Sequence, residues 1–258
     1  MTDDSGTRPL LDSARLAGSP LPIEVLGEAT STNALLAARA RAGAAPLVIV
    51  AEHQTAGRGR LDRTWETPAR AALTFSVMLR PSIRPEQWPW LPLLTGLAVR
   101  EALPLRADLK WPNDVLVGER KVCGILVERV DSPIGPAAIV GVGINVSTTE
   151  AELPVPTATS LLLEGVTADR TQLLLDILRS LHSLQAQWAA QGDAWLRAAY
   201  SSVCSSLGRT VRVDLPGGTQ VTGAAAELDA QGRLVVLGPD GPVAVGAGDV
   251  VHVRASDQ

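Results

Sequence analysis

Residues 52–65 read EHQTAGRGRLDRTW and follow an apolar run at 47–51, which predicts a buried strand leading into a loop. The loop holds two glycines, three arginines and one tryptophan: Gly57, Gly59, Arg58, Arg60, Arg63 and Trp65. Glycines let the backbone approach a ligand without a Cβ in the way, and each guanidinium is a planar, permanently charged set of donors. With backbone amides and a flat aromatic face, these groups suit a phosphate attached to a flat heterocycle. A solvated glycine–arginine run that attracts nucleic acid has similar letters, so the loop alone leaves both interpretations open.

Composition narrows the classes of protein to consider. The chain has 258 residues, 46% of them hydrophobic, and a net charge of −4, which fits one large domain or one plus a small one. That charge disfavours a strongly basic nucleic-acid binder. No apolar stretch is long enough for a transmembrane helix, and the acidic start MTDDSGT is unlike a secretory signal. We therefore expect a cytoplasmic protein with no membrane partner. Cys123 and Cys204 are expected to be buried free thiols, and the three scattered histidines give no metal-ligand spacing.

The hydrophobic pattern up to residue 200 contains both strands and helices. Strands are expected at 23–26, 47–51, 73–79, 115–117, 121–128 and 137–146, and helices at 34–41, 90–103, 171–190 and 194–200. This pattern predicts an α+β fold, a mixed sheet with helices. Ser31, Thr32 and Asn33 precede the first of these helices. One of them is enough for a cap, which leaves polar groups free for a ligand at the helix N-terminus.

The two ends of the chain differ from its middle. Residues 1–20 are polar and are expected to form a flexible lead-in with one short helical turn at 10–16. After Gly208, short strands are expected at 210–214, 220–228, 233–237, 242–247 and 250–254. Five short strands at this spacing predict a small β-barrel. The expected domains are thus the lead-in at 1–20, a ligand-binding domain at 21–207 and a barrel at 208–258.

Four polar insertions lie at strand ends, where a scaffold can hold them in register. They are Ser31–Asn33, Gln54–Trp65, Lys110–Asp114, and Lys121 with Gly124. Five cations (Arg58, Arg60, Arg63, Lys110 and Lys121) accompany a single carboxylate, that of Asp114. Each of these residues taken alone is most often a solvated charge or a turn residue. Together, cations clustered around one acid suit phosphoryl or nucleotidyl chemistry with Mg²⁺.

An ordered set of motifs between about residue 22 and residue 146 resembles the biotin–protein ligases. The set consists of STN at 31–33, HQT at 53–55, GRGRLDRTW at 57–65, KWPND at 110–114, KVCGILVE at 121–128 and GVGIN at 141–145. The resemblance implies a catalytic domain related to class II aminoacyl-tRNA synthetases at 21–207 and an SH3-like C-terminal barrel at 208–258. It also implies biotin and ATP as substrates, Mg²⁺ as cofactor, and biotinyl-5′-AMP as intermediate. The biotinyl group would pass to one lysine of a biotin carboxyl carrier protein domain of a biotin-dependent carboxylase.

The same resemblance implies a role for each matching residue. Biotin would be bound by Ser31, Thr32, Asn33, Gln54, Gly57, Arg58, Gly59, Arg60, Lys121 and Gly124. The nucleotide would be bound by Trp65, Lys110, Asn113, Asp114 and Asn145. The catalytic set would be Lys121, Arg58, Arg60 and Asp114: the arginines would hold the biotin carboxylate and the phosphate, Lys121 would bridge them, and Asp114 would lie near Mg²⁺ or the incoming lysine. The polar segment 147–160 is predicted to fold over the adenylate.

Some alternatives and departures stay open. A lipoate–protein ligase or acyltransferase would share the scaffold, and a nucleic-acid-binding protein or a non-catalytic biotin-binding module would use parts of the site. Only about 20 residues precede the first expected strand, too few for the helix-turn-helix domain of some relatives, so we expect a monofunctional ligase with no repressor activity and no DNA partner. Leu61 and Asp62 stand where some relatives carry basic residues. We expect a monomer or a weak homodimer.

Overall fold

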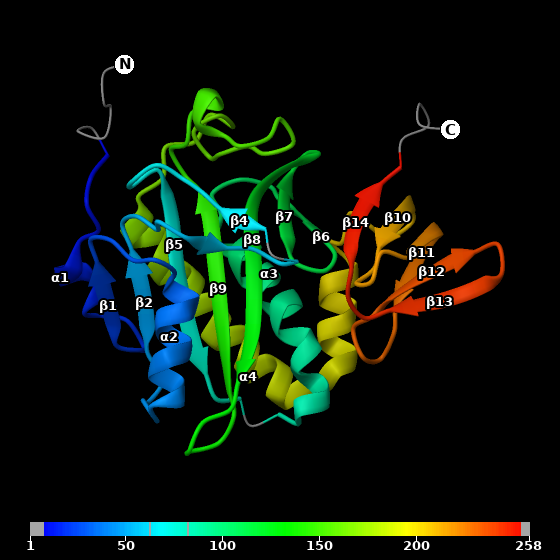
Figure 1. The fold of residues 1–258 in the computed structure, drawn as a ribbon, viewed down its shortest axis with the longest axis horizontal. Coiled ribbons are helices and arrows are strands. Elements are labelled where there is room, and N and C mark those ends of the chain that lie inside the picture. The colour runs from blue at the N-terminus through cyan, green and yellow to red at the C-terminus, as the bar shows by residue number, and fades with distance from the viewer. Residues whose placement is uncertain (1–7, 62, 82, 254–258) are drawn as a thin grey trace.

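A computed structural model describes residues 8–61, 63–81 and 83–253, and contains two main sheets (Figure 1). The larger sheet has seven strands in the order β1-β2-β5-β9-β8-β7-β6. Its strands are β1 (Ile23–Leu26), β2 (Val48–Ala51), β5 (Ala72–Leu79), β6 (Asp108–Lys110), β7 (Asp114–Val117), β8 (Arg120–Val130) and β9 (Ala137–Asn145). The pair β1–β2 is parallel and the other pairs are antiparallel, so the mixed sheet expected from the sequence is confirmed.

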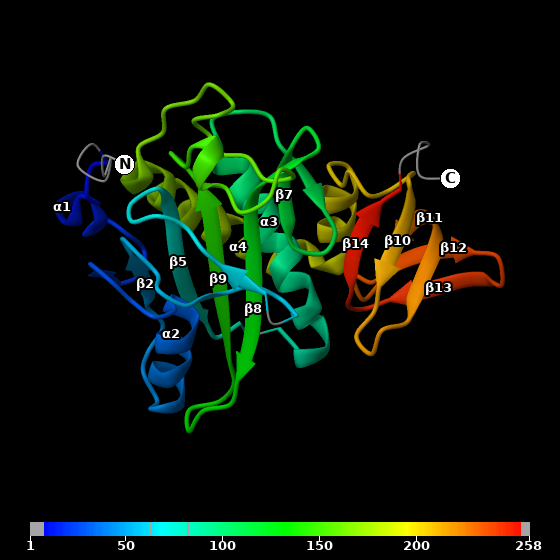
Figure 2. The same ribbon diagram turned by 45° about the horizontal axis from the view of Figure 1, so that its top comes forward.

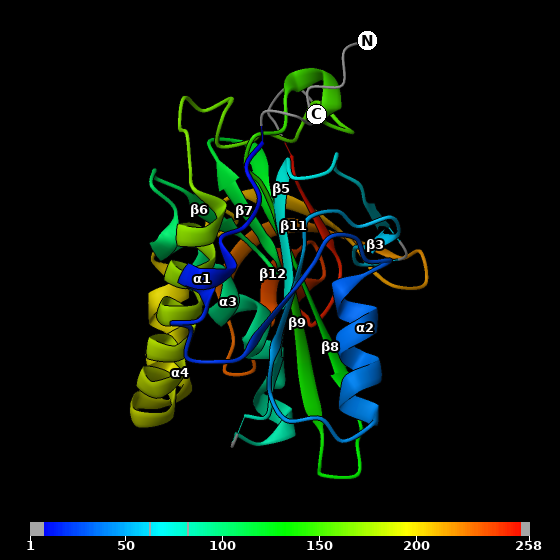
Figure 3. The same cartoon turned by 90° about the vertical axis from the view of Figure 1, so that its left-hand side faces the viewer.

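Helices cover both faces of this sheet (Figure 3). They are α1 (Ser13–Leu16), α2 (Thr32–Arg41), α3 (Leu91–Ala102) and α4 (Arg170–Ser201), with two short 3₁₀ helices, η2 (Pro85–Trp90) and η3 (Glu150–Glu152). Helix α2 packs on one face, and its Leu36 and Ala40 are fully buried with residues of β2, β5 and β9. Helices α3 and α4 pack together on the other face over the main core. Because both faces are covered, β5 and β9 are buried along their whole length.

Helix α4 is interrupted at Gly192, whose φ of 77° and ψ of −177° are not helical. The sequence pattern predicts two helices, at 171–190 and 194–200, and this break separates them. Glycine adopts such a conformation readily, so the helix breaks at this residue and each part has its own apolar stripe. Asp169 caps the start of α4 through its carboxylate.

The smaller sheet lies at one end of the molecule, beside α3 and α4 (Figure 2). Its five antiparallel strands follow the order β13-β12-β11-β10-β14. They are β10 (Thr210–Asp214), β11 (Gln220–Leu228), β12 (Leu234–Gly238), β13 (Gly241–Val245) and β14 (Asp249–His252). The sequence located all five strands to within two residues. In the described residues β13 and β14 are the two edges of the sheet, so closure into a barrel stays a prediction.

The two sheets belong to one continuous hydrophobic core. Trp111, in the turn between β6 and β7, is 2% exposed and donates its indole N–H to the carbonyl of Gly232, 3.0 Å away. This contact joins the turn of the large sheet to the β11–β12 turn of the small one. Cys123 and Cys204 are buried free thiols, as expected, and burial raises the pKa of both.

Part of the segment expected to be a flexible lead-in packs against the body of the protein. Leu11 and Leu16 are buried in the main core, and Asp12 caps α1. The α1 turn lies inside the range expected from the sequence. None of the helices in the described residues combines the length and apolar character needed to cross a bilayer.

Candidate active site

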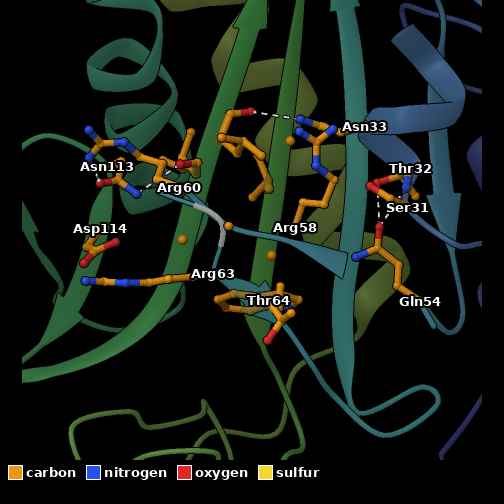
Figure 4. Close-up of a pocket in the computed structure, with 18 of the residues that line it drawn as sticks. Ser31, Thr32, Asn33, Gln54, Arg58, Arg60, Arg63, Thr64, Asn113 and Asp114 are labelled. Carbon is orange, nitrogen blue, oxygen red and sulfur yellow. Dashed lines mark hydrogen bonds between the residues drawn. The ribbon is translucent and has the colours of Figure 1, made fainter. Parts of the chain in front are cut away.

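A cavity lies on the large sheet beneath the glycine–arginine loop, which forms a short hairpin of β3 (Gly57–Arg58) and β4 (Thr64–Trp65) (Figure 4). One side of the cavity, here called the neutral end, is formed by Ser31, Thr32, Asn33 and Gln54. The other side, the charged end, is formed by Arg60, Arg63, Asn113, Asp114, Lys121 and Asp249. Between the two ends the wall is apolar, with Phe75, Ile125, Leu126 and Val142.

The neutral end is a connected set of hydroxyl and amide groups. Ser31 caps α2, so the side chains of the first helical residues point into the cavity, as expected from the sequence. The backbone N–H and hydroxyl of Thr32 lie 2.7 and 3.0 Å from Gln54 Oε1. Ser76 Oγ, on β5, lies 2.7 Å from the Thr32 hydroxyl and 2.6 Å from Asn33 Oδ1. Ser76 is fully buried, which fixes this network from below.

Glycines in the sheet make room for the residues that line the cavity. A Cβ on Gly141 would lie 2.3 Å from Asn33 Oδ1, and a Cβ on Gly143 would lie 2.5 Å from the Trp65 ring. A Cβ on Gly124 would meet Lys121 at 3.0 Å and Trp65 at 3.2 Å. The sequence pattern predicts a close approach at Gly124, and the approaching groups are these two side chains.

The charged end consists mainly of paired groups. The Lys121 ammonium lies 2.6 Å from Asp114 Oδ1, although this buried oxygen has no aligned hydrogen-bond partner among the described residues. Arg63 pairs with Asp249 at 2.5 Å. Arg60 instead donates to neutral oxygens, Asn113 Oδ1 at 2.8 Å and the Gly248 carbonyl at 3.1 Å. Arg60 is therefore available to a further anion.

Two pKa shifts reflect this arrangement. Burial lowers the pKa of Arg60, and the nearby carboxylate of Asp114 partly opposes the effect. Burial acts to raise the pKa of Asp249, but the hydrogen bond and ion pair with Arg63, together with the charges of Lys110 and Lys121, outweigh it. The Asp249 pKa is consequently lowered, and its carboxylate is ionised at neutral pH.

A second, wider cavity adjoins the charged end and shares Trp65, Asp114 and Lys121 with the first. Lys110 and Asn145 line only this second cavity, together with β14 and part of the 154–158 segment. The backbone N–H of Lys121 donates to the Thr157 carbonyl at 2.8 Å, and Asn145 Nδ2 donates to the Thr159 carbonyl at 2.9 Å. The 147–160 segment therefore lies beside the second cavity, as closure over a ligand would require, and its closure stays a prediction.

The structure brings together most of the residues singled out from the sequence, with three differences. Asn113, expected to bind the nucleotide, lines the first cavity and not the second. Gly57 does not line either cavity: a Cβ there would lie 2.3 Å from the Trp65 carbonyl, so this glycine serves the β3–β4 hairpin. Arg58 lines the first cavity but extends toward Asn33, whereas Arg60 lies beside Asn113 (Figure 4). The Arg58 guanidinium pairs with Glu128 at 3.1 Å. The five cations thus occupy two adjoining cavities, and Arg63 and Lys121 line both.

Four residues of the site were missed from the sequence: Ser76, Glu128, Asp249 and His252. Ser76 carried a signal, since it is a polar residue in an otherwise apolar strand. Asp249 and His252 lie on β14, and nothing in the letters indicates that this strand of the small sheet lies beside the glycine–arginine loop. The small sheet therefore contributes directly to the second cavity.

The pKa of His252, which lines the second cavity, is strongly lowered. Burial, followed by the charges of Lys110 and Arg209, lowers the His252 pKa from 6.5 to about 4. Its side chain is 10% exposed, and Nε2 lies 3.0 Å from the Ser206 hydroxyl. The ring is neutral in the folded protein at physiological pH.

A histidine whose folded pKa is depressed stabilises the fold above its unfolded pKa and loses that contribution as pH falls. Between pH 7 and pH 5 we expect the unfolding free energy to fall by about 2 kcal/mol on account of His252, because the imidazole is protonated in the unfolded chain but stays neutral in the folded one. Urea unfolding of the wild type and of His252→Gln at both pH values measures this. The variant keeps a hydrogen-bonding amide near Ser206, and its unfolding free energy should fall by about 2 kcal/mol less than that of the wild type between pH 7 and pH 5. Equal falls in the two proteins would contradict the lowered pKa of His252.

Both parts of the chain match known protein families. Residues 24–145 match the Biotin/lipoate A/B protein ligase family, and residues 206–253 match the Biotin protein ligase C terminal domain. The chain is 43% identical to the biotin–[acetyl-CoA-carboxylase] ligase of Mycobacterium tuberculosis, over 98% of this chain and all of that protein. It is 30% identical to the bifunctional ligase/repressor BirA of Escherichia coli, over 92% of this chain and 75% of that protein. The structure resembles the biotin protein ligase of Aquifex aeolicus in complex with biotin and ATP, with a TM-score of 0.77 and 30% identity over 91% of this chain and 99% of that one.

Proposed function

Because the chain belongs to the biotin protein ligase family, we propose that it activates biotin with ATP as biotinyl-5′-AMP and transfers the biotinyl group to a carrier-protein lysine. The acceptor is a lysine of the biotin carboxyl carrier protein domain of a carboxylase. The observation that carries this function is the pair of adjoining cavities that share Lys121, Trp65 and Asp114. Two substrates bound in such cavities would meet at the shared residues.

The first cavity suits biotin along its whole length. A urea ring has two N–H donors and one carbonyl acceptor, which the hydroxyl and amide groups of the neutral end can match. The apolar wall between the ends would pack on the thiophane ring and the aliphatic chain. The carboxylate would then reach the charged end, where Arg60 has no carboxylate partner among the described residues.

We place the first reaction step at the junction of the cavities. A biotin carboxylate oxygen attacks the α-phosphorus of ATP, an acyl–O–P bond forms, the α–β P–O bond breaks, and pyrophosphate leaves. The two reacting groups are anions that repel each other, so fixed positive charge from Lys121 and Arg60 is needed to bring them together. Arg58 contributes to the neutral end in this scheme, because its guanidinium pairs with Glu128 instead of facing Lys121.

The second cavity is assigned to the nucleotide, with Trp65, Lys110, Asp114 and Asn145 as its contacts. Asn113, also expected to bind the nucleotide, lines the first cavity and accepts a hydrogen bond from Arg60. Two buried polar atoms, Trp65 Nε1 and Asp114 Oδ1, have no aligned hydrogen-bond partner among the described residues, which supports a ligand there, although Asp114 Oδ1 is ion-paired with Lys121. The described residues hold no cluster of three or more metal-binding side chains. Mg²⁺ is commonly held by one or two carboxylates plus substrate phosphates, so Asp114 fits a magnesium ion that arrives with ATP and neutralises phosphate charge.

In the second step the neutral amine of the acceptor lysine attacks the acyl carbon of the adenylate. An amide forms and AMP leaves with the bonding electrons. Asp114 and Asp249 are the carboxylates nearest the junction, and either could receive the proton that the amine releases. We further propose that the large sheet belongs to the class II synthetase type and the small one to the SH3-like type.

The test is incubation of the protein with biotin, ATP, Mg²⁺ and a biotin carboxyl carrier protein domain. The carrier's mass should rise by one biotinyl group, and the rise should need both biotin and ATP. Replacing biotin by lipoate should leave the mass unchanged. Modification by lipoate in preference to biotin would overturn the substrate assignment.

A further inference from the structure

The carboxylate of Glu128 on β8 lies beside the neutral end of the first cavity; it ends the KVCGILVE motif, but the sequence assigned it no role. Its Oε1 lies 3.1 Å from Arg58 Nη2, and its Oε2 accepts a hydrogen bond from Asn33 Nδ2 at 2.8 Å. Glu128 shares one face of β8 with Gly124 and Leu126, both of which line the cavity. A single carboxylate thus joins the glycine–arginine loop to helix α2 across the cavity.

Asn33 is fixed independently of Glu128. Its side-chain oxygen lies 2.6 Å from the buried Ser76 hydroxyl, and the missing Cβ of Gly141 leaves the space that this oxygen occupies. The amide nitrogen of Asn33 therefore has a set direction toward Glu128. The Glu128 carboxylate is placed where it meets Arg58.

The two ends of the cavity consequently differ in charge. At the charged end, three cations (Arg60, Arg63 and Lys121) face two carboxylates (Asp114 and Asp249), which leaves a surplus of one positive charge. At the neutral end, Arg58 is balanced by Glu128. Without Glu128, both ends would carry a positive charge surplus and both would attract an anion.

This difference matters for a substrate that carries a carboxylate at one end and an uncharged ring at the other. Only the charged end adjoins the second cavity, so a carboxylate drawn to Arg58 would be held away from the nucleotide. Specificity between two poses requires a cost for the wrong one as well as a gain for the right one. A fixed negative charge beside Arg58 supplies that cost.

We propose that Glu128 is a positioning residue that directs the biotin carboxylate to Lys121 and Arg60 by neutralising Arg58. The inference rests on the proposed function, since it assumes that biotin occupies the first cavity. Glu128 acts through Arg58 and through charge, and it takes no part in bond making. A role limited to fastening the loop mechanically would need the ion pair itself, whereas this role needs only that Arg58 is not left as an unbalanced cation.

Two variants separate the charge-balancing role from a purely mechanical one. Glu128→Gln keeps the shape and a hydrogen-bonding amide but unbalances Arg58, and Arg58→Gln/Glu128→Gln removes both charges and the ion pair. Asp131→Asn is the matched control, because its carboxylate pairs with Arg129 at 3.1 Å outside the cavity. Each protein is measured in two assays: binding of biotin and of its uncharged methyl ester by calorimetry without ATP, and single-turnover formation of biotinyl-5′-AMP.

We expect Glu128→Gln to slow adenylate formation about tenfold while its preference for biotin over the methyl ester rises severalfold. The double variant should regain most of the lost rate, and Asp131→Asn should match the wild type. A double variant as slow as Glu128→Gln, or an equal loss of affinity for biotin and ester in Glu128→Gln, would overturn the orienting role while leaving the ligase assignment intact. A wild-type protein that forms no adenylate from biotin and ATP would overturn the proposed function, and this inference with it.

Discussion

Replacing Lys121 with alanine is expected to slow the formation of biotinyl-5′-AMP by about 100- to 1000-fold, the loss typical of removing one preorganised charge-stabilising donor. Lys121 lines both cavities, as does Arg63, whose guanidinium is paired with Asp249. The Lys121 ammonium lies 2.6 Å from Asp114 and 5.9 Å from the centre of the Trp65 ring, so it is already held at the junction before any substrate binds. Such preorganisation is what makes a fixed charge effective as negative charge develops on the α-phosphate.

Pyrophosphate release under single-turnover conditions measures the effect. Arg120→Ala is the matched control, since Arg120 is the neighbouring cation on β8 but pairs with Glu164 at 2.7 Å and lines neither cavity. We expect the control to retain nearly the full rate. If Lys121→Ala released pyrophosphate within a factor of about three of the control, the charge would not be needed at the transition state and the placement of the reaction would be wrong.

The sequence was informative about this site where chemistry and local pattern coincide. Lys121 and Gly124 lie in a recognisable strand, and the capping residues 31–33 mark a helix start, so these residues could be assigned to a strand and to a helix end. The partners of the cations could not be predicted. Glu128 is 70 residues from Arg58, and Asp249 is 186 residues from Arg63. Such ion pairs depend on how loops and sheets pack, which periodicity does not encode.

For the fold, too, local elements could be predicted from the sequence, whereas contacts between distant segments could not. Alternation and apolar stripes located the strands and long helices, because burial on a sheet or helix face imposes a period. The position of β14 beside the glycine–arginine loop produces no such periodic pattern in the sequence. Composition also misled at the N-terminus, where residues 1–20 were expected to be flexible. Leu11 and Leu16 are buried there, and the backbone N–H groups of Leu11 and Asp12 donate to Glu52 and Thr171 of distant segments.

The N-terminal segment is held mainly by a buried ion pair with which it forms hydrogen bonds. The pair joins Arg170, the first residue of α4, to Glu52, which lies just before His53 and Gln54. Both side chains are 6% exposed and their closest atoms are 2.6 Å apart. Arg170 also donates to the carbonyls of Pro9 and Ala72, and Glu52 accepts the backbone N–H of Leu11. A cation at a helix N-terminus opposes the helix dipole, so this arginine is explained by its partners and not by the helix.

Arg170→Ala is therefore expected to lower the unfolding free energy by about 3–5 kcal/mol, because the Glu52 carboxylate would stay buried without its partner. Urea unfolding followed by circular dichroism measures the loss. Arg179→Ala, on the same helix, breaks an exposed pair with Asp176 and should cost less than about 1 kcal/mol. If the Arg170 loss arises from an unpaired charge, Glu52→Gln/Arg170→Met should be clearly more stable than Arg170→Ala alone, since neither charge then remains buried. A double variant no better than the single one would show that the hydrogen bonds to Pro9 and Ala72 carry the stability instead, and that the N-terminal segment is held by neutral contacts.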